Sequence, residues 1–253
     1  MILGPNKPFV EVCVSPDKYH LYREYNRIVV VIDVLRATSA ICTAFDYGVE
    51  RIIPVSAIED ALDYKSKGYI VAAERNGEVV AGFDRGNSPF GFMDEELAGQ
   101  TVVLTTTNGT KTINIARDAG RIVIGSLLNL DVLCKWLIEQ EENVLLLCSG
   151  WKDKENLEDT ICAGAIAEQL LDSMKFQSIE DSTIMAKYLY LSAKENYLGF
   201  LKASSHRRRL QKLNMNADIK YCLTPNQSES IAIMEGDALV KLKVPQAKVK
   251  VKG

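Results

Sequence analysis

The chain of 253 residues has only two histidines, no excess of positive charge and no long apolar run. Two histidines cannot furnish a histidine-rich zinc or di-iron centre. With 30 Lys and Arg against 33 Asp and Glu, the net charge of −3 excludes a generally basic nucleic-acid-binding protein, although not a local basic pocket. No apolar stretch approaches the roughly 20 residues that a bilayer-spanning helix needs. We therefore expect neither nucleic acid nor a membrane as a partner.

The cysteines lack the spacing of a metal site or a redox motif. The six of them are scattered, with no Cys-x-x-Cys, and most lie inside apolar runs such as Val144–Cys148. This placement predicts free buried thiols in a reducing compartment, with disulfides as the alternative. The first residues show no basic segment followed by a long apolar core, so we expect no signal peptide and a cytoplasmic location.

Several catalytic signatures are also missing. The sequence contains no Cys-x5-Arg, Arg-His-Gly or Asp-x-Asp-x-Thr phosphatase motif, no Gly-x-Ser-x-Gly and no P-loop. The polar groups available for chemistry are then carboxylates, arginines and hydroxyls. That set suits Mg²⁺ and a small phosphorylated or otherwise anionic substrate.

Short β-branched runs alternate with helical patterns through most of the chain. Continuous runs such as Ile28–Ile32 indicate strands buried on both faces, as in parallel sheets covered by helices. The expected strands are Phe9–Val14, Ile28–Asp33, Arg51–Val55, Tyr69–Ala73, Thr101–Thr106, Arg121–Gly125 and Val144–Cys148. The expected helices are Ala37–Tyr47, Ala57–Lys67, Thr110–Asp118, Leu130–Gln140 and Leu157–Ser173, with residues 180–223 mostly helical.

This alternation predicts an α/β fold with a layered α/β/α architecture, largely parallel or mixed sheets and a helical C-terminal third. We expect two lobes, residues 1–100 and 101–253, with the boundary only approximate. The tail Leu239–Lys252 alternates apolar residues with lysine, which predicts an exposed edge strand; anion contact by these lysines is the alternative.

Polar clusters follow several of the expected strands, where ligands bind in open α/β sheets. Asp33 comes directly after the first buried run, with Arg36, Thr38 and Ser39 close behind it. A carboxylate, an Arg and two hydroxyls next to a helix start can hold a cation and a phosphate together. Helix capping and an Asp33–Arg36 ion pair explain the same residues equally well.

The segment Glu74-Arg75-Asn76-Gly77 and the loop Gly82–Pro89, which contains Asn87, form a second group. The glycines permit tight turns whose N–H groups can cradle anions, but a surface ion pair and ordinary turns are the alternative.

A third group, Thr105 to Thr110, places hydroxyls of Thr107 and Thr110, the amide of Asn108 and the flexible Gly109 at a strand-to-helix junction. Capping accounts for one or two of these residues but not for so many hydroxyls, so we favour an anion site.

Two further clusters contain acidic or basic groups. Glu158 and Asp159 open a helix, where acidic residues are favoured by the dipole; alternatively one of them joins Asp33 and Glu74 around a hard cation. His206 precedes three arginines and is a candidate phosphate contact or general acid, although a lone histidine is more often structural.

Taken in order, these clusters resemble the 2-phosphosulfolactate phosphatase family from about residue 10 to about residue 235. The matching motifs are Asp33-Val-Leu-Arg-Ala-Thr-Ser, Glu74-Arg-x-Gly, Gly86-Asn-Ser-Pro, Thr106-Thr-Asn-Gly-Thr, Gly125-Ser-x-x-Asn129, Glu158-Asp159, Ala163-Gly164 and Ser205-His206 with Leu210 and Asp218. The segment Thr224-Pro-Asn-Gln-Ser-Glu and the Lys-rich tail depart from the family pattern.

The resemblance implies a two-lobed α/β phosphatase that hydrolyses 2-phosphosulfolactate to sulfolactate and phosphate with Mg²⁺, a step of coenzyme M biosynthesis. On this basis we expect Asp33, Glu74 and Asp159 to hold Mg²⁺, and either His206 or a water to protonate the leaving group. Arg36 is expected to act in catalysis and to bind substrate with Thr38, Ser39, Arg75, Asn87, Thr107, Asn108, Gly109 and Thr110. Two alternatives stay open: another small phosphorylated hydroxy acid as substrate, and a non-catalytic anion-binding protein. Assembly into a homo-oligomer also stays open.

Overall fold

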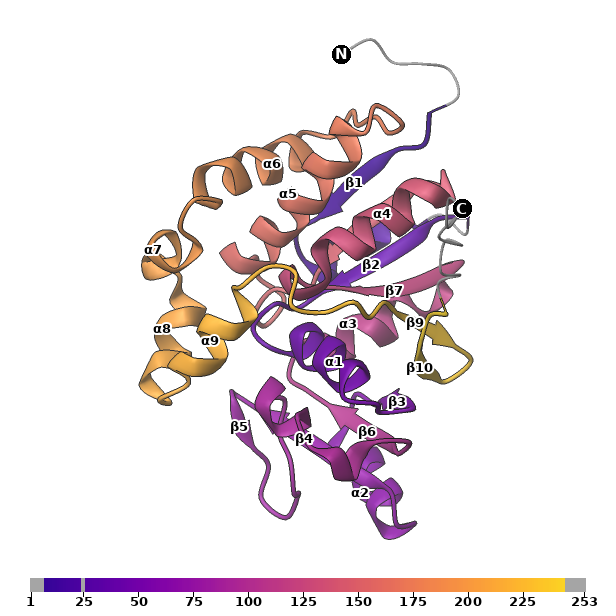
Figure 1. Cartoon of the computed structure of the whole chain (residues 1–253), viewed down its shortest axis with the longest axis vertical. Helices are drawn as coiled ribbons and strands as arrows, with labels where there is room; N and C mark the ends of the chain where they lie inside the picture. The colour runs from indigo at the N-terminus through magenta and orange to yellow at the C-terminus, as the bar shows by residue number, and fades with distance from the viewer. Residues whose placement is uncertain (1–6, 24–25, 244–253) are drawn as a thin grey trace, which may run out of the picture.

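The computed structural model describes residues 7–23 and 26–243, which build a mixed sheet flanked by helices (Figure 1). The strand order across the sheet is β1-β8-β2-β7-β9-β10-β3-β6-β4-β5. The strands are β1 (Val10–Cys13), β2 (Ile28–Ile32), β3 (Arg51–Pro54), β4 (Ile70–Arg75), β5 (Glu78–Val79), β6 (Thr101–Thr105), β7 (Arg121–Gly125), β8 (Val144–Cys148), β9 (Ala232–Glu235) and β10 (Ala238–Lys241).

Two parallel groups of strands make up most of the sheet. In one group β1, β8, β2 and β7 pair in parallel, and in the other β3, β6 and β4 do. The hairpin of β9 and β10 lies between them, because β9 pairs antiparallel with β7 and β10 pairs antiparallel with β3. The C-terminal hairpin therefore joins the two parallel groups into one sheet.

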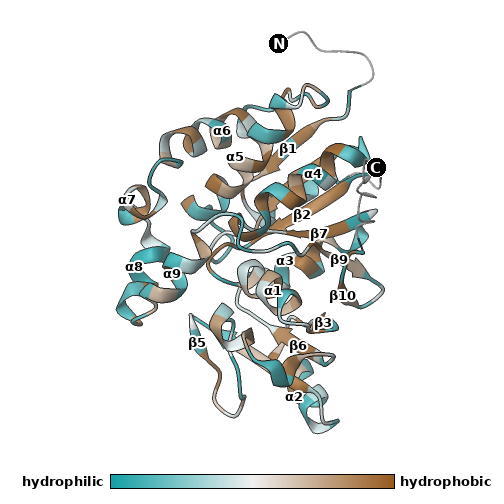
Figure 2. Ribbon diagram, viewed as in Figure 1, coloured by the Kyte–Doolittle hydropathy of each residue, from teal (hydrophilic) through white to brown (hydrophobic). Residues whose placement is uncertain are grey.

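The buried run in β2 shows how the layers arise. Ile28, Val30 and Ile32 belong to the apolar core on one face of the sheet, whereas Val29 and Val31 belong to the core on the other face. Since successive side chains of a strand point to opposite faces, an unbroken apolar strand needs a helical layer on each side. The central strands are accordingly the most hydrophobic part of the ribbon, and α8 is among the most hydrophilic (Figure 2).

Helices supply those layers. The helices are α1 (Ala37–Asp46), α2 (Ile58–Ser66), α3 (Gly109–Ile115), α4 (Leu130–Gln140), α5 (Leu157–Asp172), α6 (Asp181–Ala193), α7 (Tyr197–Phe200), α8 (Ser205–Lys212) and α9 (Asn216–Cys222). Short 3-10 segments lie at Pro16–Leu21, Pro89–Phe92, Glu95–Leu97, Ala116–Asp118, Leu127–Asn129 and Leu201–Ala203. α5 packs on β1, β2 and β8, and α6 packs beside it on α5 and β1 (Figure 1). α1 contacts β7, and α3 contacts β2 and β3.

The structure confirms the α/β class, the mixed sheet and the helical character of residues 180–223. The cysteines are free and buried, as predicted. The described residues include no helix long and apolar enough to cross a membrane.

The predicted edge strand in the tail is wrong for its described part. β10 has a neighbour on each side, and its Leu239 is fully buried against the core. The lysines at 248, 250 and 252 lie outside the described residues. Strands from both sides of residue 100 interleave in the one sheet, since β6 lies between β3 and β4. The division into two lobes stays a prediction.

Candidate active site

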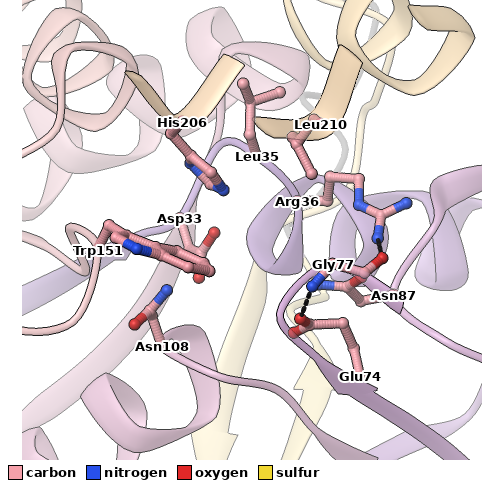
Figure 3. A pocket seen from close by; sticks show the side chains of 10 residues that line it. All are labelled: Asp33, Leu35, Arg36, Glu74, Gly77, Asn87, Asn108, Trp151, His206 and Leu210. Carbon is pink, nitrogen blue, oxygen red and sulfur yellow. Dashed lines mark hydrogen bonds between the residues drawn. The ribbon is translucent and has the colours of Figure 1, made fainter. Parts of the chain in front are cut away.

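A small pocket opens where β2, β4 and β6 end and the loop after β8 meets α8 (Figure 3). This is the edge of the sheet at which open α/β folds bind ligands. The pocket is lined by Asp33, Leu35, Arg36, Glu74, Gly77, Asn87, Asn108, Trp151, His206 and Leu210.

Asp33 brings a poorly compensated carboxyl group to the pocket. It follows β2 directly, is 6% exposed, and its Oδ1 accepts only a long bond of 3.4 Å from the N–H of Ala37. Burial raises the pKa of Asp33 to about 6, with His206 acting in the opposite direction and Glu74 adding to the rise. A cation or a proton in the pocket would relieve this unfavourable charge.

Glu74, at the end of β4, is held in place by the loop after β6. Its Oε2 accepts from the N–H of Thr107 at 3.0 Å, and its Oε1 accepts from the Thr107 hydroxyl at 3.0 Å and from the N–H of Gly77. The carboxylate is thus rigidly oriented toward the pocket that it lines with Asp33 (Figure 3).

Arg36 supplies the positive charge of the pocket. Its guanidinium forms a buried ion pair of 2.8 Å with Asp218 and donates to the carbonyl of Gly77 at 2.6 Å. The expected partner Asp33 is therefore replaced by Asp218, 182 residues away in the sequence. Because a guanidinium carries five N–H donors, these two contacts leave others for an anion.

His206 reaches the pocket from α8 and is held by Glu158. Its Nδ1 lies 2.6 Å from Oε1 of Glu158, which is fully buried. The ring of Trp151 lies against the imidazole with the two centroids 4.9 Å apart (Figure 3).

Two amide side chains complete the polar lining. Asn108 accepts from the N–H of Lys152 at 3.1 Å through its Oδ1, so its amide nitrogen is left to donate elsewhere. The Oδ1 of Asn87 is buried and has no partner within the described structure. Since buried polar atoms are normally hydrogen-bonded, this amide fits a ligand group.

The described structure does not place Asp159 in the pocket lining with Asp33 and Glu74. Asp159 is fully buried outside the pocket lining, and its oxygens accept from the N–H groups of Val34 at 2.8 Å and Gly150 at 3.0 Å and from Asn156. Burial raises the pKa of Asp159 well above its ordinary value, and Asp33 and Glu158 add to the rise. Across residues 7–23 and 26–243, no three His, Cys, Asp or Glu side chains are placed to hold a metal.

Comparison with known proteins agrees with this chemistry. A family model described as 2-phosphosulpholactate phosphatase matches residues 13–237. The chain belongs to this family. It is a phosphoric monoester hydrolase.

Relatives match the phosphatase over nearly their whole length. A protein of Thermotoga maritima is 38% identical over 216 residues, which cover 85% of this chain and 92% of the relative. A protein of Caldanaerobacter subterraneus is 34% identical over 223 residues, which cover 83% of this chain and 92% of the relative. A protein of Synechocystis is 39% identical over 201 residues, which cover 77% of this chain and 83% of the relative. Each of the three bears the curated name "Probable 2-phosphosulfolactate phosphatase".

The structure brings some predicted site residues of the phosphatase together and leaves others outside the pocket lining. Those in the lining are Asp33, Arg36, Glu74, Asn87, Asn108 and His206. Those outside it are Thr38, Ser39, Arg75, Thr107, Gly109, Thr110 and Asp159.

Most of the outlying residues shape the loops around the pocket. The Thr38 hydroxyl accepts from the N–H of Asp33 at 3.1 Å, and that of Ser39 donates to the carbonyl of Val34 at 2.8 Å. Thr110 exchanges reciprocal side-chain bonds with Thr106, which is the capping alternative at this junction.

Arg75 and Gly109 act at the same junctions without lining the pocket. The Arg75 guanidinium donates to the carbonyls of Glu74 and Ser56 and to the hydroxyl of Thr105. Gly109 lies so close to Asp33 that a Cβ there would be 2.8 Å from Oδ2.

Trp151 and the contact between Glu158 and His206 are missing from the expected site. The residues alone leave Glu158 and Asp159 as equal candidates for a functional acid, and nothing local relates Glu158 to a histidine 48 residues away. The sequence signal for Trp151 is its place in the loop directly after β8, at the sheet edge where the other polar clusters lie.

Proposed function

We propose that the phosphatase hydrolyses 2-phosphosulfolactate to sulfolactate and inorganic phosphate with Mg²⁺, as the step of coenzyme M biosynthesis that its family implies. The observation that carries the proposal is that Asp33, Glu74, Arg36 and His206 line one pocket in a chain of this family. We also place the reaction in a reducing compartment, the cytoplasm, since the described cysteines are free.

Asp33 and Glu74 are the groups that would hold Mg²⁺. Two buried carboxylates lie in one pocket, and the proximity of Glu74 contributes to the raised pKa of Asp33. This ion is usually held by one or two carboxylates together with substrate oxygens and water, so a pair suffices without Asp159. Bound there, Mg²⁺ would neutralise phosphoryl charge and polarise the phosphorus.

The chain's own residues then bind and orient the ester. The remaining N–H groups of Arg36 and the amide nitrogen of Asn108 donate to its anionic oxygens, and Asn87 presents its unpaired Oδ1 as an acceptor. His206 places a ring nitrogen in the pocket and gives its proton to the oxygen that leaves phosphorus. Leu35, Leu210 and Trp151 restrict water around the reacting groups.

Release of inorganic phosphate tests the proposal. The purified protein is assayed with 2-phosphosulfolactate and Mg²⁺, in parallel with a chelator and with a panel of small phosphorylated hydroxy acids. We expect release that is selective for 2-phosphosulfolactate and abolished by the chelator. Selective release from another ester would replace the substrate, and binding without release from any ester would indicate an anion-binding protein.

Variants test the metal assignment. Asp33→Asn and Glu74→Gln should each lower kcat at least about 100-fold and raise the Mg²⁺ concentration needed for half-maximal rate. Asp84→Asn is the matched control, because Asp84 is exposed and, among the described ion pairs, contacts only Lys65 of α2. An Asp33→Asn protein with full Mg²⁺-dependent turnover would exclude Asp33 as a metal ligand.

A further inference from the structure

The contact between Glu158 and His206 joins two groups that are both shielded from water. Glu158, in the first turn of α5, is fully buried, and His206, in the first turn of α8, is 5% exposed. The 2.6 Å between Oε1 and Nδ1 is a short hydrogen bond. A carboxylate at one ring nitrogen fixes the proton on that nitrogen and leaves the other nitrogen for chemistry.

Glu158 is itself held on its second oxygen. Oε2 accepts from the hydroxyl of Ser204 at 3.0 Å, and the same hydroxyl oxygen accepts from the N–H of Arg207 at 3.1 Å as the N-cap of α8. The carboxylate therefore joins the start of α5 to the start of α8, on which His206 is carried. Both oxygens of Glu158 are thus engaged in orienting α8 and His206.

The imidazole is also restrained across its face. The Trp151 ring lies at an interplanar angle of 32° to it, and the guanidinium carbon of Arg209 lies 4.2 Å from the centroid of the same tryptophan ring. His206 and Trp151 both line the pocket. With Nδ1 turned to Glu158, the opposite nitrogen Nε2 is the one available to the pocket (Figure 3).

We propose that Glu158 is a positioning residue that holds His206 with a proton on Nδ1 and Nε2 directed at the leaving oxygen of the substrate. The inference rests on the proposed function, because it names the group that makes His206 an effective acid in that reaction. Glu158 touches no substrate in this arrangement and acts only through the imidazole.

The proton balance of the step is simple. As the bond between phosphorus and the ester oxygen breaks, that oxygen takes the proton of Nε2 and leaves as the hydroxyl of the product. The ring is then neutral, with its remaining proton on Nδ1 and shared with Glu158. The water that attacks phosphorus keeps one proton on the phosphate and gives up the other, which restores the imidazolium.

Nitrogen-15 NMR of the histidines tests the geometry independently of activity. The chain has only two histidines, so the spectrum contains two imidazoles, and the exposed His20 serves as an internal reference. At a pH where both rings are neutral, we expect His206 to show a protonated Nδ1 and an unprotonated Nε2. A wild-type spectrum with the proton on Nε2 of His206 would overturn the proposal.

Replacement of Glu158 tests how its contact with His206 affects the tautomer of the imidazole and the rate of catalysis. Glu158→Gln should shift the His206 tautomers toward Nε2–H while leaving His20 unchanged, and should lower kcat roughly 10²–10⁴-fold with KM changed less than about threefold. Glu155→Gln is the matched control, because Glu155 lies in the same segment but is exposed and pairs with Lys18. The control should move neither the spectrum nor kcat.

The outcomes separate this proposal from the proposed function. An unchanged His206 tautomer in folded Glu158→Gln refutes the positioning role whatever the substrate is. If wild-type protein shows the expected tautomer but releases no phosphate, the geometry stands and the proposed activity fails. If Glu158→Gln does not fold, the wild-type spectrum still decides, because a neutral His206 that carries its proton on Nε2 would refute the proposal.

Discussion

Replacing Asp33 by asparagine should stabilise the folded protein while it abolishes activity. The carboxyl group lies buried at the end of β2 and receives a single long hydrogen bond, from Ala37. Asparagine has nearly the same shape and retains an oxygen for that bond, but it carries no charge. The substitution therefore removes the cost of desolvating a carboxylate.

The size of the effect follows from the pKa. Burial raises the pKa of Asp33 from 3.8 to about 6, so between these values the folded protein binds more protons than the unfolded chain. Stability thus falls as the pH rises through this window, and the loss is complete above the pKa of the folded state. A shift of about two pH units corresponds to about 3 kcal/mol, which is an upper value for the gain in the variant.

We would measure the free energy of unfolding of the wild type and of Asp33→Asn in urea between pH 4 and pH 8. A chelator is present so that no metal offsets the charge of Asp33. We expect little difference near pH 4 and a midpoint higher for Asp33→Asn above pH 6.5. Asp84→Asn, at an exposed position, should show no such pH-dependent gain. The desolvation argument would be refuted if Asp33→Asn were no more stable than the wild type at pH 8, or if its gain in stability were equal at pH 4 and pH 8.

Three further predictions concern packing, ion pairing and thiols. Gly109→Ala would place a methyl group 2.5 Å from the Cβ of Ala37, so we expect an unfolding free energy lowered by about 1–3 kcal/mol; an unchanged melting temperature would contradict the close approach. Arg36→Met leaves Asp218 buried without its cation and should cost about 3–5 kcal/mol in urea unfolding, and adding Asp218→Leu should recover most of it; no recovery would contradict the pairing. Burial raises the pKa of all six thiols, so a chromogenic disulfide reagent at pH 8 should react slowly with the native protein. After unfolding, the reagent should titrate all six thiols, and a fast reaction of the native protein would contradict their burial.

The sequence predicts best the elements whose apolar runs are long and bounded by polar residues. Arg121–Gly125, Val144–Cys148 and Leu130–Gln140 are found with the predicted bounds. The two-residue β5 is too short to show a pattern and is not predicted. β9 is not predicted and β10 is predicted as an edge, because their places in the sheet depend on pairing with the distant strands β7 and β3.

The candidate site also contains residues that could be placed from the sequence and others that could not. Glu74 and Asn108 could be placed together from sequence, since they follow parallel strands that prove to be neighbours, and Asp33 could be placed at the carboxyl end of its own strand β2. The partners of Arg36 and His206 could not, because Asp218 and Glu158 reach them through helix packing that no local pattern encodes. Hydroxyls near a helix start serve capping and anion binding alike, so sequence alone does not separate the two roles.

The position of the C-terminal hairpin has a consequence for synthesis of the chain. β9 and β10 are the last strands to be made, yet they separate and pair with β7 and β3 in the middle of the sheet. Until residue 241 has left the ribosome, both of these strands present unpaired backbone edges that can pair with another chain. Nascent chains and products truncated before residue 232 should therefore depend on chaperones and aggregate readily, even though they contain every residue of the pocket.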